Sequence, residues 1–419
     1  MNQLREQMHR FRRRFLLFLA VLGPGIITAI ADNDAGGVAT YTVAAATFGI
    51  ASQFLIIPTT FLLGLSQDIG ARISVVTRKG IADLIREQYG IKISILIFAL
   101  YFVVNQGVVL QNVSGLKSAY GLFNFPWQIP LIITCVILVL SVIKFSYKRL
   151  QQIFFLLIAF YFSYVVVAVI VKPDWLAIAK ETVYPQKITM NFSYWFSIIA
   201  VLGTTITAWG QFFVSSYIND KKLSIDQLKY ERLEIYVGAL LTNLLSFMIA
   251  VAVASTLFAS GISVESAADA AISLQPLAGN FASVLFAVGL FGASILGLTV
   301  VPLATAYVFA EFFGYEGSLD TDFKKGKLFY LFFIIQIAIG LIATLFPQVN
   351  LFALTIYVDF LNGAMLPVIF FFLIRFSEDR AIMGDHVVSG FSSIFLRICA
   401  VLITIAVMIS MFGKLFGII

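Results

Sequence analysis

The sequence predicts an all-α integral membrane protein of about eleven transmembrane helices, built as two inverted five-helix repeats whose first and sixth helices are discontinuous. Three observations predict this fold. Of the 419 residues, 60% are hydrophobic and only 12% are charged, whereas about a quarter of the residues in soluble globular proteins are charged. Apolar segments of bilayer length recur along the whole chain. Two of these segments, five spans apart, are interrupted by polar residues and glycines.

The apolar segments locate the spans. The first is expected over 15–31 and continues to 48, and the others follow at 50–77, 92–122, 127–145, 149–171, 194–218, 229–259, 278–314, 326–346, 348–375 and 392–416. The chain is therefore divided into a basic N-terminus (1–14), a first repeat (15–171), an extracellular loop (172–193), a second repeat (194–376) and a last helix (392–416).

Basic residues mark alternate connections and so support the position of each span. One group precedes the first span: Arg5, Arg10, Arg12, Arg13 and Arg14. The others lie between spans two and three (Arg72, Arg78, Lys79, Arg86 and Lys92), four and five (Lys144, Lys148 and Arg149), and six and seven (Lys221, Lys222, Lys229 and Arg232). Further groups lie between spans eight and nine (Lys324, Lys325 and Lys327) and ten and eleven (Arg375 and Arg380). Positive loops stay in the cytoplasm, which predicts a multi-pass plasma-membrane protein with its N-terminus inside and its C-terminus outside.

The remaining composition excludes several classes of protein. The net charge of +6 comes from short loops between spans, so it does not indicate nucleic-acid binding. Cys135 and Cys399 lie far apart in apolar runs and predict neither a disulfide nor a metal cluster. The chain begins like a secretory signal, but a Gly-Pro-Gly within the apolar run and the spans that follow predict that it is not cleaved. We expect a monomer in the lipid bilayer, without a cofactor.

The first interruption, ADNDAGG at residues 31–37, combines two carboxylates with two glycines inside a span. An aspartate near the middle of a membrane helix costs roughly 2.5–3.5 kcal/mol on insertion, so such residues are usually functional. Gly36 and Gly37 are poor helix formers and predict unwinding here. We interpret the segment as a binding site rather than a packing motif, because packing does not require Asp32 and Asp34.

The second interruption lies in the sixth span, in LGTTITAWGQ at residues 202–211. It holds two glycines, three threonines and Gln211. Interruptions at matching positions in two halves are typical of inverted-repeat transporters with a site at the midplane of the membrane. Close helix packing at Gly203 and Gly210 is an alternative interpretation of this segment.

The residues at both interruptions resemble the Nramp (natural resistance-associated macrophage protein) family of divalent metal transporters, and more specifically its magnesium-transporting relatives. The resemblance is carried by GPGIITAIADNDAGGVATYTVAAATFG (first helix), QDIGARISVVTRKGIADLIREQYG (second helix and its loop), GTTITAWGQFFVSSYI (sixth helix) and LNGAMLPVIFFFLIRFSED (tenth helix). It implies a LeuT-like fold with alternating access around a central metal site. By this resemblance Asp34 binds the metal directly, and the carbonyls of Thr204 and Ala31 stand where backbone ligands do.

The departures from the family pattern concern the ligands themselves. Gly37 replaces an asparagine ligand, and Thr207 replaces a methionine whose sulfur binds metal in the family. Asp359 replaces a glutamine of the tenth helix, although a structural hydrogen bond to a neighbouring helix explains Asp359 equally well. Asp32 is an additional acid.

Oxygen ligands follow from these residues, because no methionine falls in either interruption. All-oxygen sites suit Mg²⁺, Ca²⁺ and Mn²⁺, and Mg²⁺ keeps much of its water while one or two carboxylates hold it. We expect Mg²⁺, with Mn²⁺ next, as the transported substrate. The expected ligands are Asp34, Asp32, Thr207, Thr204, Ala31 and Asp359, and the expected lining residues are Asn33, Gly36, Gly37, Gln211 and Gln111.

Proton coupling is not expected, because the third span has neither an acid nor a histidine between Ile91 and Leu116. In proton-coupled relatives this helix carries acids, which Val108 and Gln111 replace here. The alternatives are a proton-coupled Mn²⁺/Fe²⁺ transporter of the same fold and an amino-acid or organic-cation carrier. An intramembrane aspartyl hydrolase is disfavoured, since two acids separated by one residue are poorly placed to share a proton across a scissile bond. We therefore do not expect an enzyme.

Overall fold

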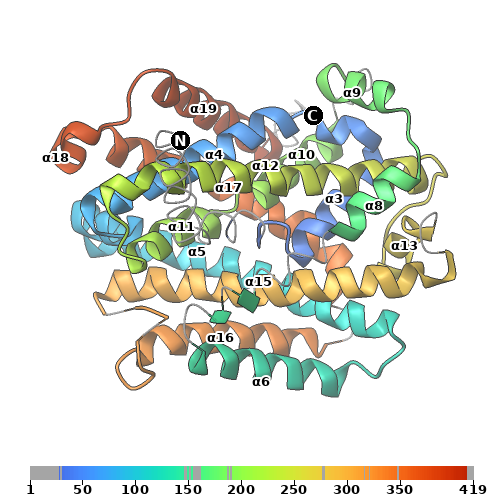
Figure 1. The fold of residues 1–419 in the computed structure, drawn as a ribbon, viewed down its shortest axis with the longest axis horizontal. Coiled ribbons are helices and arrows are strands. Elements are labelled where there is room, and N and C mark those ends of the chain that lie inside the picture. The colour runs from blue at the N-terminus through green and yellow to red at the C-terminus, as the bar shows by residue number, and fades with distance from the viewer. Residues whose placement is uncertain are drawn as a thin grey trace, which may run out of the picture.

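The computed structural model describes residue 28 and residues 31–412, except 146–148, 151, 154–161, 186–187, 189–190, 276–278, 316, 320 and 347–348. Every regular element in these ranges is a helix (Figure 1). The predicted basic N-terminus (1–14) and the parts of the predicted spans at 15–27, 29–30, 151, 154–161, 278, 348 and 413–416 lie outside the described residues. The prediction of an all-α membrane protein is confirmed for the part of the chain that the structure describes.

The helices follow the predicted order. Those of the first half are α3 (Ala35–Phe48), η1 (Gly49–Gln53), α4 (Ile56–Thr77), α5 (Ile81–Leu122), α6 (Gln128–Lys144), α8 (Phe162–Ile170) and α9 (Trp175–Val183). Those of the second half are α10 (Phe192–Thr205), α11 (Ala208–Asp220), η3 (Ile225–Gln227), α12 (Leu228–Val253), the π-helical turn η4 (Ala254–Phe258), α13 (Ala267–Ile272), η5 (Gly279–Phe281), α15 (Ala282–Phe313), α16 (Lys327–Thr344), α17 (Leu351–Ser377), α18 (Arg380–Met383), η6 (Gly384–His386) and α19 (Phe391–Phe412).

Seven of the described helical stretches are long and apolar enough to cross a membrane, and a bent pair adds up to one more. The bend of 93° separates α3 and η1 from α4, at the place where the sequence predicts the end of the first span. The repeat boundaries proposed from the sequence stay a prediction.

One predicted helix start is wrong and another coincides with a kink, and a glycine lies at each. The sequence predicts that the second span begins at residue 50, but Gly49 has a φ of +63° and is followed by the short helix η1, so α4 begins only at Ile56. The third span is predicted from residue 92, and α5 as a whole runs from Ile81. Gly90 (φ +75°) is non-helical and divides α5 into two helices joined at a kink, so the second of them begins next to the predicted residue.

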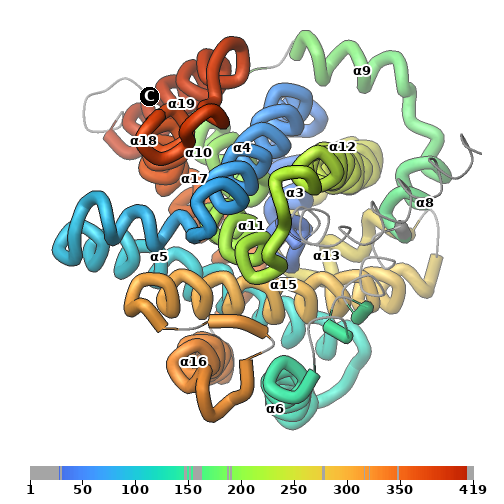
Figure 2. The backbone as a smooth tube through the Cα atoms, turned by 60° about the vertical axis from the view of Figure 1, so that its left-hand side comes forward, coloured from blue at the N-terminus to red at the C-terminus, as the bar shows by residue number. Residues whose placement is uncertain are grey.

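The broken helices lie in the middle of the bundle. α3 packs against α10, α12, α15, α17 and α5, while α6 and α16 lie side by side at one edge of the molecule (Figures 1 and 2). The outer faces of α6, α16 and α19 expose large hydrophobic side chains, as expected for helices that face lipid. The interrupted segments and their polar residues therefore lie in the interior, away from the lipid-facing surface.

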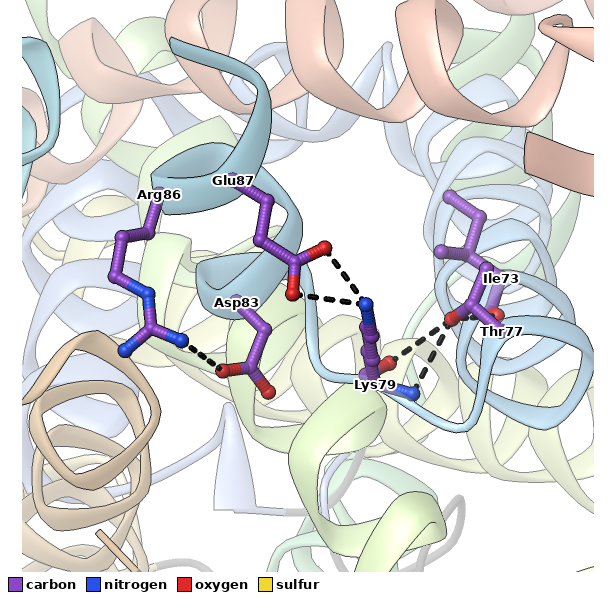
Figure 3. A network of polar contacts seen from close by, with 6 residues as sticks. All are labelled: Ile73, Thr77, Lys79, Asp83, Arg86 and Glu87. Atoms are coloured by element: carbon purple, nitrogen blue, oxygen red, sulfur yellow. Dashed lines mark hydrogen bonds and ion pairs between the residues drawn. The ribbon is translucent and has the colours of Figure 1, made fainter. Parts of the chain in front are cut away.

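Polar contacts fix the turn between α4 and α5, which the sequence predicts on the cytoplasmic side (Figure 3). The ammonium of Lys79 donates to both carboxylate oxygens of Glu87 at 2.7 and 2.8 Å, and Arg86 lies 3.6 Å from Asp83. Arg86 also donates to the carbonyl of Phe312, at the end of α15 (3.0 Å). The kinked start of α5 is thereby tied to α15.

The backbones of α10 and α17 meet at glycines. A methyl group on Gly203 would collide with the backbone of Asp359 and Gly363, and one on Gly363 would lie 2.6 Å from the carbonyl oxygen of Ile199. The packing interpretation of Gly203 is thus supported, because only a residue without a side chain allows this approach.

We expect Gly203→Ala to lower the thermal unfolding midpoint in detergent, because overpacking of a tight contact costs typically about 1–3 kcal/mol. The control is Gly121→Ala in α5, where an added methyl group meets no atom within 4 Å. It should be neutral or stabilise by about 0.5–1 kcal/mol. Equal midpoints for the two variants would contradict the close approach of α10 and α17.

Candidate functional site

The first interruption is shorter than the sequence predicts. Only residues 32–34 are non-helical, because the Asp34 carboxylate accepts the N–H of Gly37 (3.0 Å) and so caps a helix that begins at Ala35. Gly36 and Gly37, expected in the unwound segment, instead form the first turn of α3. Gly37 allows a close approach, because a methyl group there would lie 2.7 Å from the Asp32 carbonyl oxygen and 3.3 Å from the Thr204 hydroxyl.

The second interruption has the same design. α10 ends at Thr205, Ile206 and Thr207 are non-helical, and the Thr207 hydroxyl caps α11 by accepting the N–H of Gly210 (3.0 Å). Gln211 therefore lies within α11 and not in the break. The same Thr207 hydroxyl donates to Oδ1 of Asp32 at 2.6 Å, so the two interruptions are in direct contact.

Two asparagines replace the helical hydrogen bonds that the breaks remove. In a continuous helix the N–H of Ala35 would donate to the carbonyl of Ala31, but it donates to Oδ1 of Asn112 instead (3.1 Å). In the same way the N–H of Ala208, whose helical acceptor would be Thr204, donates to Oδ1 of Asn362 (3.0 Å). The carbonyls of Ala31 and Thr204, which the family resemblance identifies as backbone ligands, therefore do not accept these helical hydrogen bonds.

Asn112 also holds the central carboxylate. Its Nδ2 donates to Oδ2 of Asp34 at 2.5 Å and to the carbonyl of Val108 at 2.9 Å. The sequence did not reveal that Asn112 and Asn362 complete the breaks. Asn112 could have been identified from the sequence because its polar amide falls within the apolar stretch of the third span.

Asp359 lies beside the first turn of α3. It accepts hydrogen bonds from the Thr40 hydroxyl (2.5 Å) and from the side chain of Gln111 (3.2 Å). Thr355 joins this group and donates to the carbonyl of Gly36 (3.0 Å). Asp359 thus makes hydrogen bonds to neighbouring helices, which is the structural role that the sequence offered as an alternative to metal binding. Its carboxylate and that of Asp34 also repel each other.

Asn33 points away from this group. Its amide donates to the carbonyl and hydroxyl of Thr242 (2.8 and 2.7 Å) and accepts from Ser246 (2.6 Å), both on α12. Although the sequence predicted it as a lining residue, Asn33 anchors the break to α12. The structure therefore brings together Asp32, Asp34, Thr204, Thr207, Gly37, Gln111 and Asp359, and separates Asn33 from them.

The buried carboxylates at and beside the breaks have no cationic partner among the residues that the structure describes. Asp32, Asp34 and Asp359 are only 2–3% exposed, and none of the ion pairs among the described residues involves them. Oδ2 of Asp32, Oε1 of Gln111 and both polar atoms of Gln211 have no hydrogen-bond partner within the described ranges. Buried carboxylates normally require a compensating charge, so this arrangement is suited to a cation.

The group is built from oxygen. No three His, Cys, Asp or Glu side chains in the described part of the chain lie together as a conventional metal cluster. Carboxylates, hydroxyls and backbone carbonyls are hard ligands, and a hard cation would keep water on its remaining positions. The arrangement can therefore hold a partly hydrated divalent cation.

A polar cavity of about 1060 Å³ lies at the far end of α11. Its walls include Ser216 and Asp220 of α11, Asp83 of α5 and Glu311 of α15. Since α11 begins directly after Thr207, one short helix connects the interruption with this cavity.

The chain is similar to known proteins along most of its length. The family described as natural resistance-associated macrophage protein-like matches residues 25–413. A "Divalent metal cation transporter MntH" of Staphylococcus haemolyticus is 27% identical over 213 residues, which are 49% of this chain and 47% of the relative. The match thus spans about half the length of that relative. The protein of the same name from Yersinia enterocolitica is 25% identical over 306 residues, 70% of this chain and 73% of the relative.

Solved structures share the fold. A manganese transporter of Eremococcus coleocola superposes with a TM-score of 0.75 at 16% identity, covering 95% of this chain and 87% of that one. MhsT, solved with L-phenylalanine, superposes with a TM-score of 0.58 at 14% identity, covering 92% and 97%. The predicted LeuT-like fold is confirmed.

We expect Asn112→Leu to destabilise the protein by roughly 1–3 kcal/mol for each buried group left unpaired, since Oδ2 of Asp34 and the N–H of Ala35 both lose their partner. The measurement is thermal unfolding in detergent. Asn105→Leu, on the same helix, is the matched control, because its partner Thr305 keeps a second bond to Val301. An equal loss of stability in the two variants would contradict the special role of Asn112.

Proposed function

The chain belongs to the natural resistance-associated macrophage protein-like (Nramp) family, and from this premise we propose that it is a secondary transporter that carries divalent metal ions across the membrane by alternating access. The names of the relatives support this substrate class, because they are divalent metal cation transporters and a manganese transporter. We propose a monomer in the plasma membrane with a cytoplasmic N-terminus and an extracellular C-terminus, as the basic loops predict.

A single observation carries the proposal: buried carboxylates that have no cationic partner in the described part of the chain lie where two broken helices meet. Asp32 and Asp34 come from the first break, and the Thr207 hydroxyl joins the second break to them at 2.6 Å. The released carbonyl of Thr204 lies in the last turn of α10, and the C-terminal end of a helix carries partial negative charge. A cation is stabilised by both features.

We propose that the ion is bound by Asp34, Asp32, Thr207, Thr204 and Ala31, with Asp359 acting through its own charge and through Gln111. Asp34 accepts hydrogen bonds through both oxygens, from the N–H of Gly37 and the amide of Asn112, and Asp32 accepts one from the Thr207 hydroxyl. They are therefore oriented before the ion arrives. Because Gly37 has no side chain, the first turn of α3 lies close to the Asp32 carbonyl and the Thr204 hydroxyl.

Mg²⁺ fits these properties best, with Mn²⁺ next. Mg²⁺ dehydrates reluctantly and is commonly held by one or two carboxylates with several waters retained. The thioether that favours softer metals is replaced by the Thr207 hydroxyl. A proton-coupled Mn²⁺/Fe²⁺ transporter is the second candidate, favoured by the similarity in fold to a solved manganese transporter.

We propose that transport is uncoupled from protons. The partners of the carboxylates on α5 are the amides of Asn112 and Gln111, which do not titrate. A membrane potential of 100 mV contributes about 4.6 kcal/mol for a divalent cation, at about 2.3 kcal/mol per unit charge. That supports an inward gradient of roughly a thousandfold, at about 1.4 kcal/mol per decade. Voltage alone therefore suffices for uptake.

The route to the cytoplasm follows α11. The three carboxylates are nearly sealed from solvent, while the polar cavity of about 1060 Å³ lies at the other end of this helix. Movement of α11 relative to α3 would break the Thr207–Asp32 hydrogen bond and open the ion to that cavity. Both broken helices would then serve as the moving parts, as in other inverted-repeat transporters.

We expect the purified protein to bind Mg²⁺ and Mn²⁺ in isothermal titration, and Asp34→Ala to weaken both by at least about tenfold, since losing even an outer partner of a metal ligand costs roughly 10–100-fold in affinity. Asp174→Ala is the control, because Asp174 caps α9 as Asp34 caps α3 but lies outside the breaks. Unchanged binding by Asp34→Ala would refute the site. Binding of Mn²⁺ without competition by millimolar Mg²⁺ would favour the second candidate.

We expect proteoliposomes to take up Mg²⁺ or Mn²⁺ without acidification of the lumen at zero membrane potential, because the amides on α5 cannot carry protons. An inside-negative potential should increase the uptake. A pH-sensitive dye and a metal-sensitive dye in the same vesicles measure the two fluxes. Metal-dependent acidification at zero potential would refute uncoupled transport.

A further inference from the structure

An apolar groove lies away from the carboxylates, between α4, α9 and α12. It has a volume of about 340 Å³, at the lower end of the roughly 300–1,000 Å³ usual for ligand pockets. In Figure 2, α9 stands off from the bundle on the side of α4 and α12. Most of the lining is apolar and includes Ile57, Trp175, Ile178, Leu240, Leu244 and Phe247.

Three polar side chains line the groove, and two of them are satisfied within their own helices. The Thr60 hydroxyl donates to the carbonyl of Ile56 (2.6 Å), and the Thr182 hydroxyl donates to the carbonyl of Ile178 (2.8 Å). Asn243 differs from both. It is only 2% exposed, and neither its amide nitrogen nor its amide oxygen has a hydrogen-bond partner within the described residues.

An unpaired amide in apolar surroundings is costly, and buried polar groups in folded proteins are nearly always paired. The groove therefore suits a ligand that has a long apolar body and a hydrogen-bonding group on it. A wholly apolar ligand would leave Asn243 unpaired, and a small polar ligand would leave the groove unfilled.

The position of the groove identifies the source of such a ligand. α4 and α12 are predicted membrane spans, and their side chains beside the groove, Ile57 and Leu240, are 62% and 63% exposed, as lipid-facing residues are. α9 presents Trp175, Leu176 and Val183 outward, as expected for a helix at the surface of the membrane. The surrounding bilayer supplies molecules that carry both acyl chains and ester groups.

We propose that the groove binds one phospholipid of the bilayer, with an acyl chain between α9 and the helices α4 and α12 and an ester carbonyl that accepts a hydrogen bond from Asn243. Asn243 follows Thr242, whose carbonyl and hydroxyl hold Asn33 of the first break. The lipid therefore contacts the helix that anchors this break.

The test is native mass spectrometry of the full chain, extracted from membranes in a mild detergent. The wild type is expected to retain one phospholipid per chain. Asn243→Leu removes the hydrogen bond at nearly the same volume and should reduce retention about fivefold, the effect of one lost hydrogen bond. Ala179→Trp, at an exposed position of α9 that lines the groove, should fill the groove and abolish retention.

Leu233→Trp is the control, because Leu233 is an exposed position of α12 that is not part of the groove lining. This variant should retain the lipid as the wild type does, and thermal unfolding of each variant checks that it is folded. Equal retention by the three variants would overturn the proposal, since the lipid would then be bound elsewhere. A wild type that carries no phospholipid, or that carries a detergent, peptide or other small molecule in its place, would overturn it as well.

Discussion

Every backbone polar group in the hydrocarbon layer needs a partner inside the protein, and the centre of this molecule depends on how that requirement is met at two broken helices. Asp34 and Thr207 cap the helices that follow the breaks. Asn112 and Asn362 accept the N–H groups that a continuous helix would have used, so the carbonyls before the breaks are released without leaving a donor unpaired. The breaks are stable because neighbouring helices complete them.

The same contacts arrange the charge. Within the described residues, Asp32, Asp34 and Asp359 accept hydrogen bonds from hydroxyls, amides and backbone N–H groups and from no cation, so their negative charge is oriented but not neutralised. A lysine or arginine in place of these donors would compete with a transported cation. Neutral donors orient the carboxylates without neutralising them, so the ion itself compensates their negative charge. A defined geometry is thereby combined with reversible binding.

The helices around the breaks pack closely against each other on one side and face lipid on the other. Gly203 and Gly363 let α10 approach α17, which places the second break against Asn362 and Asp359. On the opposite side of the first break, α12 holds Asn33 through Thr242 and Ser246 while its outer face lines the apolar groove. One helix, α12, thus contacts both the apolar groove and the first break.

The sequence alone determined the all-α membrane fold, the position of both breaks and the acids within them, because hydropathy and the cost of a buried carboxylate are local properties that can be read from composition and spacing. Only the tertiary structure decided which partners complete the breaks. Asn112, Asn362 and Thr242 lie on helices far away in the chain, and no local pattern reveals which amide faces which N–H. It also decided that Gly36 and Gly37 are helical, since capping by Asp34 outweighs their low helix propensity, and that Asn33 turns towards α12. Helix packing brings these distant residues together, and the spacing of residues along the chain contains no measure of that packing.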